Sequence, residues 1–529
     1  MAHGAHDAIV VGAGPNGLVA ANLLADVGWS VLLLEAQPEV GGAVRSDREL
    51  HPDFVHDTFS AFYPLGAASS VLAELDLERY GVRWRHAPAV LGHPLPDGSW
   101  AMLHRDRERT AAGLDKAHSG DGDAWLELAA TWDRIGDAVI AAMLSPFPPV
   151  RGGLRSLAAV ARTGGLDLVR TLASPALTAV TDLFGGEAAR LLVAGNAGHA
   201  DIPLTAPGSS LLGILLAMLG QTVGFPVPEG GAGQLSQALA RRFVDKGGTI
   251  RCEQEVVRID VADGRVSAVR TADGQRHPVR RCVLADVSAP ALFEHLLPDE
   301  VVPGRVRRGM RRFRLDPGTV KVDWALDGAV PWANPPEIAP GTVHVAHSLR
   351  EMDQTLTQLA AGVIPDHPFM LAGQMTSSDP TRSPAGTESL WAYAHVPQPG
   401  PDVRDAGDGP VRGVWDHDDC ERFADRMQAR FEALAPGFGS RILARRVLGP
   451  RELEARDANL VGGAIGGGTA QLQQQLVFRP VPGMRGRAET GVPGVYLASS
   501  AAHPGGGVHG ACGANAARAA LAHARFRRQ

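Results

Sequence analysis

The glycine-rich turn near the N-terminus constrains the fold more than any other feature of this sequence. Residues 8–11 read Ala-Ile-Val-Val, the pattern of a buried strand, and a Gly-x-Gly-x-x-Gly turn follows at once, before an apolar helical stretch. Gly12 permits the tight turn, Gly14 lets backbone approach a pyrophosphate, and Gly17 lets the helix pack closely against the strand. The helix start adds free N–H groups and a positive dipole end. The sequence therefore predicts a Rossmann-like α/β unit that binds an adenine dinucleotide.

An acidic residue follows at the position where such a unit needs one. A second predicted strand, residues 30–34, ends in Glu35, close to the ~20-residue offset at which a carboxylate accepts the ribose hydroxyls. A glycine motif alone is weak evidence, because ordinary glycine turns can produce it. Here the strand, the helix, the second strand and the acid are in register, which favours the nucleotide site.

Size, charge and cysteine spacing exclude several other classes of protein. The chain has 529 residues, more than one hydrophobic core usually organises, which predicts at least two lobes. Its net charge of −6 at pH 7 gives no basic surface for nucleic acid. The four cysteines occur singly, with no CxxC pair for a redox disulfide or a zinc site. We expect no nucleic-acid partner and no metal.

The segment after Glu35 distinguishes between dinucleotides. Gly41 and Gly42 form a second place where bare backbone can approach the ligand, and Arg45 is available to its phosphates. This block resembles the start of the phytoene desaturase and flavin amine oxidase superfamily. The resemblance implies FAD as the cofactor, with the glycine pair and the arginine against it. It also implies that the backbone of Val256 contacts the adenine.

The C-terminus carries a second block of the same kind. A predicted strand, residues 494–498, is followed by His503-Pro504-Gly505-Gly506-Gly507-Val508 and an alanine-rich helix from about Ala511 to Arg525. Three consecutive glycines leave no side chain between this turn and a planar ligand, and the helix start can stabilise negative charge. The block resembles phytoene desaturase-related proteins, which include carotenoid desaturases, isomerases and ketolases and a mitochondrial pyridine nucleotide-disulfide oxidoreductase domain-containing protein. Ala498-Ser499-Ser500 replaces the Gly-Glu pair usual in amine oxidases, which favours the desaturase branch.

These blocks together predict the cofactor site and the domain organisation. We expect FAD to contact Gly12, Gly14, Gly17, Glu35, Ala36, Gly41, Gly42, Arg45, Val256, His503, Gly507 and Val508. The fold class is α/β, with a discontinuous Rossmann-like FAD-binding domain and an α+β substrate domain. Residues 1–80, 225–295 and 450–529 form the FAD-binding domain, and residues 81–224 and 296–449 form the substrate domain. A single alternating strand is expected at residues 249–260, and amphipathic helices at 126–143 and 154–172.

Two residues are candidates for catalysis. Lys321, on a predicted strand at residues 319–326, resembles the lysine that amine oxidases present towards the flavin through water. It is one of three lysines in a chain that otherwise uses arginine, although a solvent-facing strand lysine is an equal alternative. His56 lies in a stretch that, in the family, passes beside the flavin ring. Otherwise the flavin carries the redox chemistry, and the chain has no HExxH, nucleophile elbow or Walker loop.

The apolar segments of the sequence predict where in the cell the protein is located. The N-terminus has no basic region and cleavage site of a signal peptide, and no apolar run reaches the roughly 20 residues that span a bilayer, which predicts a cytoplasmic protein. The apolar stretch 210–225 is expected to be a core helix. The alternatives are a lipophilic tunnel wall and a peripheral contact with a membrane surface.

The sequence thus predicts an FAD-dependent oxidoreductase that dehydrogenates a lipophilic or polyketide-like small molecule by hydride transfer to flavin, with oxygen or another acceptor reoxidising it. Three alternatives stay open at this stage. They are an amine or amino-acid oxidase, a redox-neutral FAD-dependent isomerase, and a non-enzymatic flavoprotein scaffold. The sequence leaves the substrate and the oligomeric state unassigned.

Overall fold

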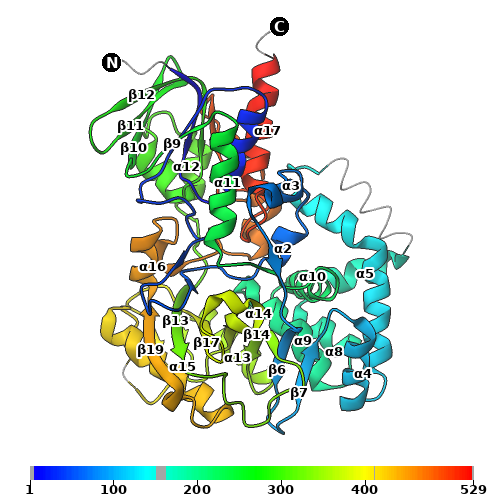
Figure 1. The fold of residues 1–529 in the computed structure, drawn as a ribbon. Coiled ribbons are helices and arrows are strands. Elements are labelled where there is room, and N and C mark those ends of the chain that lie inside the picture. Colours follow the sequence, from blue (N-terminus) through cyan, green and yellow to red (C-terminus); the bar gives the residue numbers. More distant parts are fainter. Residues whose placement is uncertain (1–4, 150–162, 410, 527–529) are drawn as a thin grey trace.

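The chain folds into two lobes, each built on its own sheet (Figure 1). The structure is a computed structural model and describes residues 5–149, 163–409 and 411–526. The described ends of the chain both lie on the upper lobe in Figure 1, where the first and last segments of the sequence meet. The lower lobe is built mainly from residues 89–222 and 318–448, whereas residues 249–285 return to the upper lobe.

The upper lobe contains a seven-stranded sheet. Along the sheet the order is β10-β11-β12-β1-β2-β9, with β20 paired to β12. Strands β12, β1, β2, β9 and β20 run parallel, whereas β10 and β11 extend the sheet as an antiparallel hairpin. The strands are β1 (His6–Val11), β2 (Val31–Leu34), β9 (Thr249–Arg251), β10 (Val256–Ala262), β11 (Arg265–Thr271), β12 (Arg276–Ala285) and β20 (Val495–Leu497). This is the predicted Rossmann-like α/β arrangement.

Three helices cover one face of the parallel strands: α1 (Pro15–Asp26), α11 (Gly233–Asp245) and α17 (Ala511–Phe526). The starts of α1 and α17 touch, because a Cβ atom added to Gly513 would lie 1.9 Å from the carbonyl oxygen of Asn16. Only glycine permits this approach. The packing therefore places the predicted dinucleotide turn beside the predicted C-terminal glycine turn.

The expectation of one strand at residues 249–260 is wrong. The structure has β9 and β10 instead, and they lie at opposite edges of the sheet. Glu253, between them, adopts a left-handed backbone with φ of 55°. That conformation ends the first strand and turns the chain across the sheet.

The lower lobe contains a second seven-stranded sheet, in the order β19-β13-β17-β16-β14-β6-β7. All its neighbouring strands are antiparallel except β14 and β6. One face is apolar and packs against α15 (His417–Leu434), in a core that includes Val320, Val322 and Trp324. The strands are β6 (Ala89–Pro94), β7 (Trp100–Leu103), β13 (Gly318–Leu326), β14 (Pro340–Val345), β16 (Met370–Gln374), β17 (Glu388–Val396) and β19 (Ile442–Leu448).

Helices cover part of the other face of this sheet. They are α4 (Arg107–Ala117), α5 (Asp121–Leu144), α7 (Gly165–Ala173), α8 (Ala176–Leu183), α9 (Glu187–Ala197) and α10 (Ser209–Thr222). The predicted helix 126–143 lies within α5, and the predicted helix 154–172 is described only from residue 163 onwards. Helix α10 is mostly buried in an apolar cluster with α9, as expected for a core helix.

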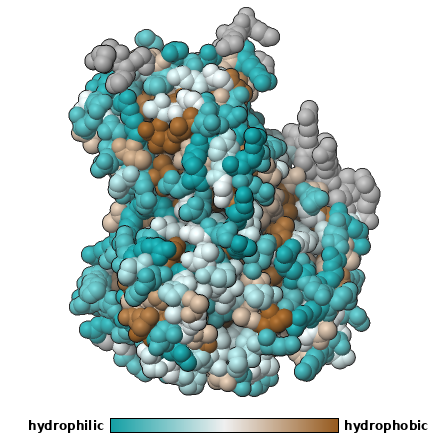
Figure 2. All heavy atoms as spheres, viewed as in Figure 1, coloured by the Kyte–Doolittle hydropathy of each residue, from teal (hydrophilic) through white to brown (hydrophobic). Residues whose placement is uncertain are grey.

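Two features are relevant to contact with a membrane, namely the length and apolarity of the helices and the hydropathy of the surface. Within the residues that the structure describes, no helix combines the length and apolarity needed to cross a bilayer. The face seen in Figure 2 is mostly hydrophilic, with smaller hydrophobic patches on both lobes.

Candidate functional site

The turn between β1 and α1 has the tight geometry that its glycines predict. Gly12 has φ of 94°, and a Cβ atom there would lie 2.6 Å from the backbone oxygen of Asp286. A Cβ atom on Gly17 would lie 2.2 Å from the carbonyl oxygen of Gly12. Neither position accepts a larger residue without moving backbone. The turn leaves the first N–H groups of α1 at the carboxyl end of the sheet, where ligands bind in this type of fold.

Glu35 ends β2 beside this turn. Its carboxylate accepts hydrogen bonds from the backbone N–H of Ala13 (2.6 Å) and of Gln37 (2.9 Å). Burial raises the pKa of Glu35, opposed by these hydrogen bonds. The backbone N–H of Gln254 donates to the Glu35 carbonyl (2.8 Å), which brings the start of β10, at Val256, next to the acid. The exposed Ala36 follows Glu35 directly.

Two carboxyl groups beside the turn, one buried and one partly exposed, were missed by the sequence prediction. Asp286, at the end of β12, accepts a hydrogen bond from the N–H of Gly17 (2.7 Å), and burial raises its pKa to about 8. Burial also raises the pKa of Asp457, whose carboxylate lies beside Gly42. The only sequence signal for Asp286 is its place at the end of a buried strand. Asp457 has no local signal, because it follows a short helix, α16 (Pro450–Arg456), distant in sequence.

The Gly41-Gly42 pair lies directly against the dinucleotide turn. A Cβ atom on Gly42 would lie 3.0 Å from the Cα atom of Gly14. Arg45 follows on the same segment, and its guanidinium donates to the carbonyl of Arg456 (2.7 Å) and lies 3.7 Å from the Glu39 carboxylate. The structure therefore brings together two glycine turns that are separate in the sequence.

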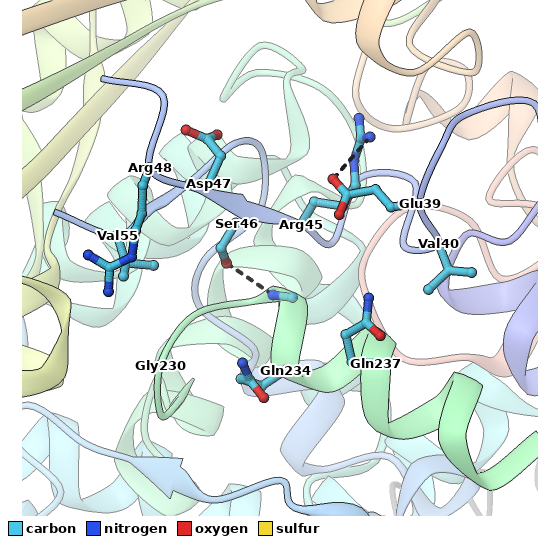
Figure 3. A pocket seen from close by; sticks show the side chains of 11 residues that line it. Glu39, Val40, Arg45, Ser46, Asp47, Arg48, Val55, Gly230, Gln234 and Gln237 are labelled. Carbon is cyan, nitrogen blue, oxygen red and sulfur yellow. Dashed lines mark hydrogen bonds and ion pairs between the residues drawn. The ribbon is translucent and has the colours of Figure 1, made fainter. Parts of the chain in front are cut away.

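A pocket of about 520 Å³ lies on the other side of this segment, between Arg45 and the start of α11 (Figure 3). The Ser46 hydroxyl there accepts a hydrogen bond from the N–H of Gly233 (3.0 Å), and Gln234 and Gln237 point towards the pocket. Its lining includes neither the Gly12–Gly17 turn nor Lys321. We therefore place the chemistry elsewhere.

The C-terminal glycine turn joins the two lobes. Leu65 lies 3.0 Å from a Cβ atom added to Gly507, and the Val508 carbonyl lies 3.0 Å from one added to Gly66. His503 starts the turn, and burial lowers its pKa to about 4. The stretch that follows His56 thus passes beside the turn that the sequence predicts for the flavin ring.

Arg479 holds this turn in place and was not predicted. Its buried guanidinium donates to the carbonyls of Ser500 (2.6 Å) and Gly466 (2.9 Å). A Cβ atom on Gly506 would lie 3.1 Å from the Cα atom of Gly466. The glycine-rich segment around Gly466 therefore forms one wall beside the C-terminal turn.

One face of the lower sheet is polar where it is not covered by helices. Thr319, Lys321 and Asp323 of β13 pair directly with His395, Tyr393 and Trp391 of β17. Directly opposed residues of antiparallel strands point to the same side, so these six side chains share one face, which we call the substrate face. The alternate residues of both strands lie in the apolar core on the other side.

Lys321 lies within a buried ion network. Its ammonium pairs with the Asp323 carboxylate, which also accepts from Arg446 (2.8 Å), and Arg446 reaches Asp47 (2.8 Å). Burial lowers the pKa of Lys321, although Asp323 opposes the change. The Lys321 ammonium also lies 5.9 Å from the centre of the Trp391 ring. The structure therefore excludes a solvent-facing position, because Lys321 is only 3% exposed.

His56 lies near this network with one ring nitrogen free. Its Nδ1 is 3.2 Å from the Ser389 hydroxyl, and that hydroxyl donates to the carbonyl of Val55 (3.1 Å). Nδ1 must therefore donate to Ser389, which leaves Nε2 as a bare lone pair. Nε2 has no hydrogen-bond partner among the described residues. Burial lowers the pKa of His56 to about 4, so the ring is neutral near pH 7.

A second ion network fixes the strand that carries His56. Strand β4 (His56–Asp57) places Asp57 on the opposite side from His56, where it pairs with the fully buried Arg382 (2.9 Å). Arg382 also pairs with Asp379 (3.0 Å), which accepts from the N–H of Gly230 (2.7 Å). No sequence motif marks Arg382, because its partner Asp57 is 325 residues away.

No metal site accompanies these groups: in residues 5–149, 163–409 and 411–526, no three His, Cys, Asp or Glu side chains are arranged to hold an ion. Lys321, Asp323 and His395 of the substrate face are instead committed to ion pairs.

Comparisons with known proteins agree with this architecture. The model of the family described as flavin containing amine oxidoreductase matches residues 16–322, more than half of the chain. Pyridine nucleotide-disulfide oxidoreductase domain-containing protein 2 of Rattus norvegicus is 29% identical over 97% of this chain and 92% of its own. Hydroxyneurosporene desaturase of Cereibacter sphaeroides is 28% identical over 97% of both chains. The solved structure of a putrescine oxidase bound to putrescine has a TM-score of 0.61 at 17% identity, covering 98% of this chain and 99% of that one, and shows likeness of fold.

Proposed function

Because the chain belongs to the flavin-containing amine oxidoreductase family and is an FAD-dependent oxidoreductase, we propose that it desaturates a lipophilic small molecule, with hydride passing to the flavin. The observation that carries this proposal is the free Nε2 atom of His56, a neutral base buried beside the substrate face. Desaturation removes a hydride and a proton from neighbouring carbon atoms. Bound FAD would supply the hydride acceptor, and the protein needs a base for the proton.

The residues of the upper lobe fit FAD. The glycines at positions 12, 14 and 17 present backbone that a side chain would cover, and the starts of α1 and α17 converge beside them. Glu35 lies at the end of β2, where ribose hydroxyls are bound in such folds. We propose that the twelve predicted residues hold the cofactor, together with Asp286. When bound, FAD supplies a two-electron acceptor.

The chain's own residues position the substrate and take up its proton. Ser389 fixes the ring of His56 so that Nε2 is the accepting atom. Asp57 and Arg382 hold the strand on which His56 lies. The Lys321 ammonium pairs with the Asp323 carboxylate, so the positive charge of one balances the negative charge of the other beside His56. The side chains of Phe62 and Leu65, which are partly buried between the lobes, exclude water from the reacting atoms.

The lipophilic character of the substrate rests on two observations. Apolar side chains from α10, Phe62 and Leu65 form a continuous cluster on the substrate side of the lower lobe. The similar hydroxyneurosporene desaturase acts, by its name, on hydroxyneurosporene. Oxygen or another electron acceptor would complete the cycle. A peripheral contact with a membrane surface would then serve to collect the substrate.

Amine oxidation is the second candidate, and the buried position of Lys321 favours it. The fold of the putrescine oxidase is similar to that of this chain. Against it, Asp323 and Trp391 engage the Lys321 ammonium. Amine oxidation predicts hydrogen peroxide release with a primary amine such as putrescine.

The proposal is tested by anaerobic reduction of the FAD-bound protein. Fractions of a lipid extract should bleach the flavin absorbance, whereas putrescine should leave it unchanged. Bleaching by the amine with peroxide release in air would favour the oxidase. If no fraction reduces the flavin, the desaturase proposal is wrong.

A further inference from the structure

Tyr393 lies at the centre of the substrate face with its hydroxyl group unused. Strand β17 is an inner strand of the sheet, yet Tyr393 keeps partial exposure. Its Oη atom makes no hydrogen bond within the described part of the chain. A partly exposed side chain on an inner strand borders a space that a ligand can reach. An O–H group left without a partner at such a place is a donor available to that ligand.

The neighbours of Tyr393 hold its ring rigidly. The ring stacks on Trp391, with centroids 5.9 Å apart and planes at 13°, and meets the edge of His395 at 5.3 Å. Phe62 packs against Trp391 at 6.0 Å, and Leu65 connects this cluster to Gly507 in the C-terminal turn. The phenol is therefore fixed in an apolar wall that extends to the predicted flavin position.

Buried ion pairs flank Tyr393 on both sides. Lys321 lies directly across the strand pair and is bound to Asp323. On the other side, His395 pairs with Asp201, and its Nδ1 lies 3.3 Å from the carbonyl of Gly318. Both ring nitrogens of His395 face acceptors, so each nitrogen carries a proton and the ring is positively charged. Neither N–H group is left to donate to a ligand.

The phenol itself stays neutral. Burial raises the pKa of Tyr393, and the charge of Asp201 raises it further. A phenol that does not ionise near neutral pH keeps its proton and can donate a hydrogen bond. A phenolate could not donate and would repel the lone pairs of an acceptor oxygen. It selects an oxygen acceptor, such as a carbonyl, over a hydrocarbon, because a hydrocarbon would leave the group unpaired in a dry site.

We propose that Tyr393 determines the substrate class by donating a hydrogen bond to an oxygen atom of the substrate, which is an oxygen-bearing lipophile rather than a pure hydrocarbon. This inference rests on the proposed desaturase function and specifies its substrate. The apolar wall takes the body of the molecule. The phenol orients it by its oxygen.

The test uses a matched pair of lipophiles, flavanone and flavan, which differ by one carbonyl group. Binding of each to the full-length FAD-bound protein is measured from the change in flavin absorbance. The wild-type protein should bind flavanone about tenfold more tightly than flavan, and Tyr393→Phe should bind the two alike. A purely structural role of Tyr393 would weaken both ligands equally. Tyr80→Phe, which removes an exposed hydroxyl bound to Asp245, is the control and should keep the preference.

Two results would overturn the inference. One is a Tyr393→Phe variant that keeps the preference for flavanone. The other is a wild-type protein without any preference for the ketone, including one that binds neither compound. Phytoene, a hydrocarbon, separates this inference from the function on which it rests. Bleaching of the flavin by phytoene alone would leave the desaturase function standing and remove the oxygen requirement, whereas failure of every extract fraction would remove the function.

Discussion

The nitrogen atom Nε2 of His56 is the group on which the proposed desaturation depends most. It is buried, neutral and without a partner among the described residues, and Ser389 fixes its tautomer. In His56→Gln, the ring nitrogen is lost and the rate of flavin reduction by substrate should fall about 10²- to 10⁴-fold. The FAD content should not change, because His56 is not among the residues predicted to hold the cofactor.

The control for this variant is His51→Gln, five residues earlier. His51 is partly exposed and contacts Phe54 and Asp53 rather than the substrate face. Rapid mixing with substrate under anaerobic conditions measures the rate in both. Equal rates for His56→Gln and wild type would show that another group accepts the proton.

A substitution at Gly17 tests the predicted cofactor site. A Cβ atom there would lie 2.2 Å from backbone, so Gly17→Ala should displace the turn and reduce bound FAD to a small fraction of the wild-type content. Gly113→Ala in α4 meets no neighbour and should keep full FAD content, with unfolding free energy raised by about 0.4–1 kcal/mol. Flavin released on denaturation gives the content directly. Full occupancy in Gly17→Ala would contradict the assignment of the turn.

Strand β4 connects the two networks, and Arg382 is its anchor. Arg382 is fully buried between Asp57 and Asp379, so Arg382→Met would leave two carboxylates without their cation. We expect a loss of about 3–5 kcal/mol in unfolding free energy, because breaking a buried pair uncovers a charge. Arg107→Met, which breaks an exposed pair with Asp133, should cost less than about 1 kcal/mol. Urea denaturation monitored by circular dichroism compares them, and equal losses would refute the anchor role.

The elements differ in how far local sequence predicts them. The glycine turn after β1, the place of Glu35 at the end of β2 and the C-terminal helix were predicted correctly, because each depends on residues close together in the chain. The substrate face could not be predicted in the same way. Tyr393 lies beside Lys321 only because β13 and β17 pair in one register, across about 70 residues of sequence. The same reason hid Arg382 and Asp286, whose partners Asp57 and Gly17 are far away in the chain. Arg479 binds carbonyls only 13 and 21 residues away, but no motif marks it. The contacts of the twelve predicted cofactor residues with FAD stay predictions.

At the scale of the whole molecule, buried titratable groups make stability depend on pH in two opposite ways. Burial lowers the pKa of four histidines from 6.5 to about 4, so the unfolded chain binds more protons and stability is lost as the pH falls from 6.5 to 4. These are His56, His93, His503 and His509. Burial raises the pKa of Asp286 to about 8 and of Glu388 to about 7, so their contribution is lost as the pH rises from about 4 to 8.

The two groups together predict a maximum of stability near pH 6.5. Below this pH the four histidines change the unfolding free energy more than the two carboxyl groups do. Above it only the carboxyl groups change the unfolding free energy. Each proton bound differently by the folded and unfolded chains contributes up to about 1.4 kcal/mol per pH unit. Urea midpoints measured from pH 4.5 to pH 8.5 check this, and a midpoint that rises steadily on acidification would contradict the assignment of neutral buried histidines.

The two lobes meet at the C-terminal glycine turn, and the proposed reaction requires residues of both lobes. Desaturation can be followed in an anaerobic single turnover with limiting substrate, in which flavin bleaching and product mass are measured together. Desaturation by hydride transfer should give one product molecule, lacking two hydrogen atoms, for each flavin reduced. A product of unchanged mass with no net bleaching would instead indicate isomerisation and contradict the proposed desaturation.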